Sequence, residues 1–96
     1  MENNLKSLRN NIDKIDDEIL ELFICRLRIV EDIYEYKKIN GMNIYDPKRE
    51  NEVLQKIDKN MSVNKYKSEL ESLFKSIMKI SSSYQEKLLG AKKWPH

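Results

Sequence analysis

The side chains best able to do chemistry are cations and amides at positions where a helical pattern requires apolar residues. Apolar residues recur at alternating spacings of three and four from Leu5 to Tyr36, the pattern of a packed helix seam, and Arg26 interrupts it. A charge within an apolar stripe is costly unless something pairs with it. Lys37 lies about three turns further on and is rotated by only about 20°, so the two cations point the same way and could hold a small ligand between them.

Two later helical segments repeat this feature. Glu50 leads an apolar face, and Ser81 and Gln85 interrupt an apolar stripe at a spacing that places both on one face of a helix. The interrupting residues are mostly cations or neutral hydrogen-bond donors. That composition fits a buried dianionic ligand better than a set of independent ion pairs.

Each of these residues also has a simpler explanation. Arg26 could form a structural ion pair with Glu50, and Lys37 could favour the negative end of a helix dipole. Ser81 could hydrogen-bond within its own helix, and Gln85 could face solvent. The sequence leaves these alternatives open.

Arg9 lies about 25 Å down the same helix from Arg26, too far to reach the same small ligand within one chain. It could reach the site of a partner whose helix packs antiparallel alongside. Because of this distance, a site shared by Arg9 and Arg26 is possible only in a dimer. The simpler explanation is that Arg9 is an ordinary surface arginine.

The chemistry open to such a site is narrow. The sequence has no histidine within the expected helices, no Ser–His pairing, no metal-ligand spacing and no glycine-rich phosphate loop. The residues suit binding, or a reaction that needs only positioning and electrostatic stabilisation. We therefore expect neither a metal nor a cofactor.

A long helix expected over residues 5–38 positions the cations. This segment contains neither proline nor glycine, and Asn40-Gly41 marks its end. At 1.5 Å per residue it spans roughly 51 Å, whereas a compact globule of this chain length is about 32 Å across. A second apolar stripe follows its C-terminal half and consists of Leu20, Phe23, Leu27, Val30 and Tyr34. We therefore predict that this half is buried on two sides, by the later helices and by another copy of the chain in a homodimer.

Two shorter helices complete an all-α prediction. Asp46-Pro47 combines an N-cap with a proline at the first helical position, and predicts a helix over residues 47–59. A third helix is expected over residues 65–89, with Ser62 or Asn64 as its cap. The residues of this helix that are expected to face inward are Tyr66, Leu70, Leu73, Phe74, Ile77, Ile80, Tyr84 and Leu88. Gly90 is expected to end it.

The composition fits one small cytoplasmic domain. The 96 residues include 35% charged side chains with a net charge of +2 and interspersed signs, which argues against nucleic-acid binding. One cysteine allows no intramolecular disulfide, and neither a signal-peptide pattern nor a membrane-spanning apolar run is present. We expect a helical domain over residues 1–90, a flexible tail over residues 91–96, no membrane or nucleic-acid partner, and a cytoplasmic location.

The polar residues together resemble a known family, the all-helical chorismate mutases, which are small intertwined dimers. The resemblance covers nearly all of residues 5–89 and rests on motifs in the family's order and spacing: Leu8-Arg9, Arg26, Lys37, Asp46-Pro47-Lys48-Arg49-Glu50, and Ser81 followed by Gln85. It implies that the chain converts chorismate to prephenate.

The resemblance also implies a role for each residue. Arg26, together with Arg9 of the other subunit, would bind the substrate carboxylates, assisted by Ser81. Lys37 and Gln85 would donate hydrogen bonds to the ether oxygen, with Lys37 also near a carboxylate. The remaining roles fall to the start of the second helix: Glu50 would accept from the ring hydroxyl, Asp46 would help through the cap, and Arg49 would support these acidic residues.

Two other functions compete with this one. An isochorismate-pyruvate lyase on the same fold breaks a similar ether bond with much of the same cationic pocket, although the Arg49-Glu50 order favours the mutase. A non-catalytic helical dimer would use the same polar residues to fix the register of its helices. Chorismate turnover with product identification separates all three.

Overall fold

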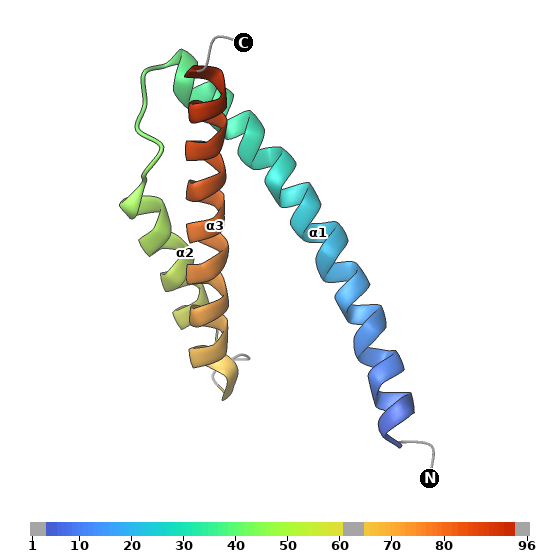
Figure 1. Cartoon of the computed structure of the whole chain (residues 1–96). Coiled ribbons are helices and arrows are strands. Elements are labelled where there is room, and N and C mark those ends of the chain that lie inside the picture. The colour runs from blue at the N-terminus through green and yellow to red at the C-terminus, as the bar shows by residue number, and fades with distance from the viewer. Residues whose placement is uncertain (1–3, 61–64, 94–96) are drawn as a thin grey trace. The chain divides into compact units, whose positions relative to one another are not determined.

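The computed structural model describes residues 4–60 and 65–93. It contains three α-helices, α1 (Leu5–Ile39), α2 (Pro47–Lys59) and α3 (Lys67–Lys93), and no strand among the described residues (Figure 1). The all-α prediction with one long helix is therefore confirmed. The chain divides into two units, Met1–Asp32 and Ile33–His96, and α1 begins in the first and ends in the second.

The first unit consists of the greater part of α1. Its start is capped by Asn4, whose side-chain oxygen accepts a hydrogen bond from the Ser7 backbone N–H at 2.8 Å. The seam residues are largely exposed, between 49 and 70%: Leu5, Leu8, Ile12, Ile15, Ile19 and Leu22. The second stripe behaves differently, since Phe23 and Leu27 are half-buried and Val30 is buried. The single chain thus leaves the seam uncovered, as a dimer would require.

The second unit begins with the last turns of α1, which end as predicted. Gly41 has a φ of +63°, and the Met42 N–H donates to the Lys37 carbonyl at 2.8 Å. The Gly41 N–H donates to the Lys38 carbonyl at 3.4 Å, which completes a Schellman ending. Glycine at this position avoids the steric cost that a Cβ brings at positive φ.

Helix α2 begins at the predicted start signal and has the predicted bounds. The Asp46 carboxylate accepts a hydrogen bond from the Arg49 backbone N–H at 3.1 Å, and Pro47 occupies the first turn. The apolar residues Val53, Leu54 and Ile57 are half-buried, and α2 contacts α3. No residue of α2 is fully buried, so the helix lies at the surface of its unit.

Helix α3 continues past the predicted stop. It begins after a short 3₁₀ turn at residues 65–66 and passes through Gly90 to Lys93, so the expectation that Gly90 ends the helix is wrong. A glycine costs a helix only about 1 kcal/mol, and the good helix former Ala91 follows, with basic residues that suit a helix C-terminus. The predicted caps Ser62 and Asn64, and residues 94–96 of the predicted tail, lie outside the described residues.

The buried face of α3 is narrower than the sequence suggested. Met78, Ser81 and Gln85 are buried, whereas three apolar residues expected to face inward are about half exposed in the single chain: Tyr66, Leu73 and Ile80. That expectation is wrong for one chain, because a helix with few neighbours covers only part of its apolar surface.

None of the described helices is long and apolar enough to cross a membrane.

Candidate active site

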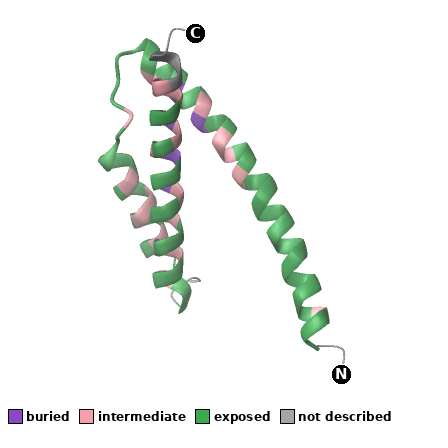
Figure 2. Ribbon diagram, viewed as in Figure 1, coloured by how far each residue is buried: buried purple, intermediate pink, exposed green. Residues whose placement is uncertain are grey.

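The interior of the second unit is unusually polar. Among the residues whose burial the structure describes, its buried side chains are Tyr34 from the end of α1 and Met78, Ser81 and Gln85 from one face of α3 (Figure 2). Buried polar groups require hydrogen-bond partners, and an interior built only for stability is mostly apolar. The predicted residues Ser81 and Gln85 therefore belong to the interior of this unit rather than to its surface.

Lys37 is half-buried in the last turn of α1. Its ammonium nitrogen Nζ donates a hydrogen bond to the Ile44 backbone carbonyl at 3.0 Å, which ties the loop after α1 back to the helix. This basic residue also suits a helix C-terminus, as the simpler explanation of Lys37 requires. An ammonium carries three protons, so one bond to Ile44 leaves Lys37 capable of donating to a ligand.

Ser81 is 6% exposed, and its hydroxyl donates to the Ile77 carbonyl one turn earlier at 2.9 Å. The alternative that Ser81 hydrogen-bonds within its own helix is therefore confirmed. A hydroxyl has a single proton, so Ser81 can accept from a ligand in this rotamer but cannot donate to a carboxylate without rotating.

Gln85 is also 6% exposed, so the alternative that it faces solvent is wrong. Its side-chain oxygen Oε1 is cut off from solvent and has no hydrogen-bond partner among the described residues. A buried acceptor without a partner costs free energy, on the order of 1–3 kcal/mol, and calls for an explanation.

The start of α2 carries the remaining predicted residues of this unit. The Asp46 carboxylate caps the helix, and Glu50, one turn later, is half-buried. The Arg49 side chain is 69% exposed and lies 3.5 Å from the Glu52 carboxylate. In the single chain, Arg49 thus makes a surface ion pair, which contributes little to stability.

The two predicted arginines belong to the first unit. Arg9 is exposed near the start of α1, and Arg26 is half-buried further along the same helix. The structure thus groups the amide, hydroxyl, ammonium and carboxylate groups of the predicted site in the second unit, and the guanidinium groups of Arg9 and Arg26 in the first.

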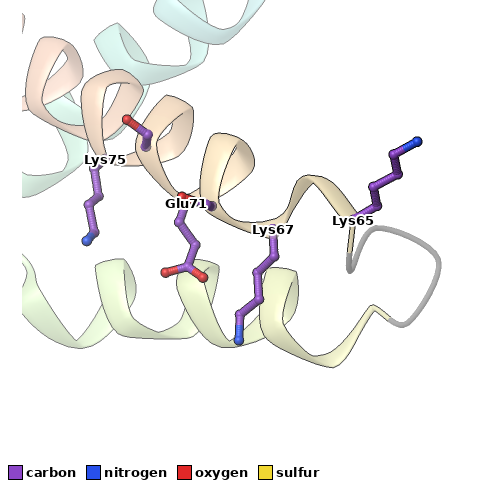
Figure 3. A pocket seen from close by; sticks show the side chains of 6 residues that line it. Lys65, Lys67, Glu71 and Lys75 are labelled. Atoms are coloured by element: carbon purple, nitrogen blue, oxygen red, sulfur yellow. The ribbon is translucent and has the colours of Figure 1, made fainter.

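An open pocket at the start of α3 is a separate feature. Figure 3 shows Lys67, Glu71 and Lys75 pointing to the side of α2, with Lys65 pointing away. Lys67 pairs with Asp58 of α2, and this hydrogen bond raises the pKa of Lys67 above its ordinary value of 10.5. None of the predicted site residues lines this pocket, whose lining residues are Lys65, Lys67, Ser68, Glu71, Ser72 and Lys75. The described residues contain no group of three or more His, Cys, Asp or Glu side chains that could hold a metal ion.

Sequence reasoning treated Tyr34 only as part of an apolar stripe, yet it is the most buried large side chain of the described residues, at 2% exposure. A signal was present in the sequence. Tyr34 precedes Lys37 by three residues, so the phenol and the ammonium lie one turn apart on the same helix face.

Comparison with known proteins agrees with the motif-based reading. Residues 8–86 match the family model described as chorismate mutase type II. The chain is 43% identical over 51 residues to the T-protein of Haemophilus influenzae, covering 53% of this chain and 14% of that protein. It is 43% identical over 53 residues to the bifunctional chorismate mutase/prephenate dehydratase of Aquifex aeolicus, covering 55% of this chain and 15% of that protein.

A third relative, the chorismate mutase of Methanocaldococcus jannaschii, is 38% identical over 55 residues, which is 57% of this chain and 56% of that protein. The matches thus span 14% and 15% of the first two relatives and 56% of the third. No solved structure gives a significant match. The family model, however, covers most of the chain, including every predicted site residue, and on this basis the chain belongs to the type II chorismate mutase family.

Proposed function

We propose that this protein is a homodimeric chorismate mutase that converts chorismate to prephenate. Family membership supports the substrate, and the observation that carries the proposal is the state of Gln85. Gln85 carries a neutral amide that is buried, and the oxygen of this amide lacks a hydrogen-bond partner among the described residues. Such a group suits a site that donates hydrogen bonds without changing protonation state.

The reaction needs little else. In this intramolecular [3,3] rearrangement one C–O ether bond breaks and one C–C bond forms, and no proton or electron is exchanged with the protein. The enzyme has to hold the substrate in a compact, chair-like conformation and stabilise the negative charge that develops on the ether oxygen. Fixed donors in a desolvated pocket do this without reorganising.

The residues take the following parts in this proposal. Lys37 and Gln85 donate hydrogen bonds to the ether oxygen, and Arg26 and Arg9 of the partner subunit bind the two carboxylates. Ser81 assists as an acceptor or, after rotation, as a donor. At the start of α2, Glu50 accepts from the ring hydroxyl, Asp46 holds the helix start in place, and Arg49 supports the acidic residues.

The proposed dimer rests on the exposed seam of α1. Isolated helices in water are marginal, and the first unit has few buried side chains of its own to stabilise it. A continuous row of leucines and isoleucines at heptad-like spacing is the surface that a second helix covers. A second copy would also bring its Arg9 to a site that lacks it.

The test is incubation of the purified protein with chorismate and, in a separate assay, with isochorismate. Because prephenate and chorismate are isomers of equal mass, prephenate is identified by its absorbance and by its chromatographic retention against an authentic standard. Formation of prephenate supports the mutase. Release of pyruvate from isochorismate, without prephenate formation, would instead assign the lyase. If a folded dimer turned over neither compound, both enzymatic functions would be excluded and the non-catalytic dimer would be left.

A further inference from the structure

The interior of the second unit contains one tyrosine that the proposed mechanism does not use. Tyr34 is 2% exposed, and the buried residues that share this small unit with it are Met78, Ser81 and Gln85 (Figure 2). These three follow one another along a single face of α3. Tyr34 on α1 and these three residues on α3 are thus buried within one and the same unit.

The Tyr34 hydroxyl oxygen and Gln85 Oε1 are both shielded from solvent, and no hydrogen bond joins these two atoms in the single chain. A phenylalanine would fill nearly the same volume as Tyr34 without placing a hydroxyl in the interior, which is favourable only if the hydroxyl interacts with other polar groups. A function for the hydroxyl is therefore to be sought among the polar groups of this interior.

Gln85 needs a donor of the kind that Tyr34 carries. To stabilise the ether oxygen, the amide must present its nitrogen to the substrate, because its oxygen would be repelled by the developing negative charge. The two ends of an amide are nearly the same size, so only hydrogen bonds decide which end points where. A donor at Oε1 would fix the orientation that the reaction requires.

The other nearby donors have different partners. The single hydroxyl proton of Ser81 is donated to the Ile77 carbonyl at 2.9 Å. The ammonium of Lys37 donates to the Ile44 carbonyl at 3.0 Å, and in the proposed mechanism it also faces the substrate. A phenol can donate and accept at once, so Tyr34 can serve Gln85 while keeping another interaction.

We propose that in the working enzyme the Tyr34 hydroxyl donates a hydrogen bond to Gln85 Oε1 and so turns Gln85 Nε2 towards the ether oxygen. The inference rests on the proposed mutase function. Tyr34 is thus a positioning residue that acts through Gln85 and does not touch the substrate. This role adds one residue to the proposed site, and that residue lies on α1 one turn before Lys37.

The first test is Tyr34→Phe in the full-length dimer. Losing one orienting hydrogen bond is expected to lower kcat about tenfold, with KM changed less than about twofold, because the contacts that bind the carboxylates are untouched. Tyr66→Phe is the matched control, since Tyr66 is 56% exposed and is not a site residue, and its kinetics should equal those of the wild type. An unchanged kcat in Tyr34→Phe would overturn the inference.

The second test separates positioning from packing. In Gln85→Glu, the side chain donates to the ether oxygen only when protonated, so activity falls as pH rises through the pKa of the new carboxyl group. A hydrogen bond from Tyr34 stabilises the carboxylate and lowers that pKa. Adding Tyr34→Phe should therefore raise the pH of half-maximal activity by about one unit. Lys37 is present in both variants, so its effect cancels in the comparison.

The outcomes separate this inference from the proposed function. A midpoint that stays in place or moves down would overturn the role of Tyr34, as would a tenfold loss of kcat shared by Tyr66→Phe. If the wild-type protein does not form prephenate, the proposed function itself fails. If the wild type is active and Tyr34→Phe equals it, only the positioning role fails.

Discussion

The two units of the chain use their apolar and polar residues in opposite ways. In the first unit, the apolar seam of α1 is exposed, and the predicted site residues are the arginines Arg9 and Arg26. In the second unit, the buried positions include Tyr34, Ser81 and Gln85, all with polar atoms. The first unit therefore lacks a covering surface, and the second contains polar groups suited to a ligand. In the proposed dimer, a second copy of the chain would cover the seam of the first unit and would bring its Arg9 to the site.

The largest expected effect comes from placing charges in the exposed seam. In Ile12→Asp/Ile19→Asp each change occurs in both chains of a symmetric dimer, and each buried isoleucine is worth about 1.5–3 kcal/mol. We expect the dimer dissociation constant to rise at least about a thousandfold, with activity lost in parallel, as measured by sedimentation and turnover across a range of concentrations.

The matched control is Asn10→Asp/Lys14→Gln, which changes the net charge by the same amount on the opposite face of the helix, where both residues are exposed. This control variant should have a dimer dissociation constant and a turnover close to those of the wild type. Equal behaviour of the two double variants would mean that the seam is not the dimer surface.

Removing Arg26 tests the role of the first unit in binding. Arg26→Ala should lower kcat/KM at least about a hundredfold while the dimer stays intact, because charge-assisted contacts to a bound anion are worth roughly 2–4 kcal/mol. Arg28→Ala is a suitable control, since Arg28 is exposed on the same helix. A loss of less than tenfold in Arg26→Ala would remove Arg26 from the site.

The pH dependence of activity tests the amide of the second unit. Because Gln85 is neutral at every pH, the wild type should keep a nearly constant kcat between pH 5 and pH 7.5. Gln85→Glu should lose activity over this range by about tenfold or more, since only the protonated acid donates a hydrogen bond. A steep loss in the wild-type enzyme itself would contradict the role of Gln85.

The smallest effects concern two glycines of the second unit. Gly41→Ala should lower the free energy of unfolding by about 1 kcal/mol, because Gly41 has a φ of +63°. Gly90 lies within α3, and a Cβ added there meets nothing within 4 Å. Gly90→Ala should therefore raise the free energy of unfolding by about 0.5–1 kcal/mol. Denaturant unfolding at fixed chain concentration measures both free energies. If both substitutions changed the free energy of unfolding in the same direction, the backbone conformations assigned to Gly41 and Gly90 would be contradicted.

Local signals predicted most of the fold. Asp46-Pro47 and Asn40-Gly41 set helix ends through capping and backbone conformation, which depend on neighbouring residues alone. Gly90 misled the prediction because a weak helix former is not a stop signal when helix formers follow it. The exposure of Leu73 and Ile80 could not be read from periodicity, which identifies an apolar face and not what covers it.

The site was predictable in its residue types more than in its details. Interrupted stripes indicated Arg26, Ser81 and Gln85, and the spacing from Arg26 indicated Lys37. The structure places Lys37, Ser81 and Gln85 in one unit and Arg26 in the other. Which hydrogen bonds Ser81 and Lys37 make within the chain depends on rotamers and on the path of the loop, and the sequence pattern does not encode these. Tyr34 was missed because an aromatic residue in an apolar stripe is ordinarily core, and only its burial with Gln85 draws attention to its hydroxyl.

The claim that two copies share each site is tested most directly by mixing Arg9→Ala and Arg26→Ala chains. Each variant alone has no intact site. A heterodimer has one site with both arginines and one with neither, so random reassortment of equal amounts should restore about a quarter of wild-type activity. If heterodimers form, as shown by native mass spectrometry, and the mixture is no more active than the parent variants, the shared site is refuted.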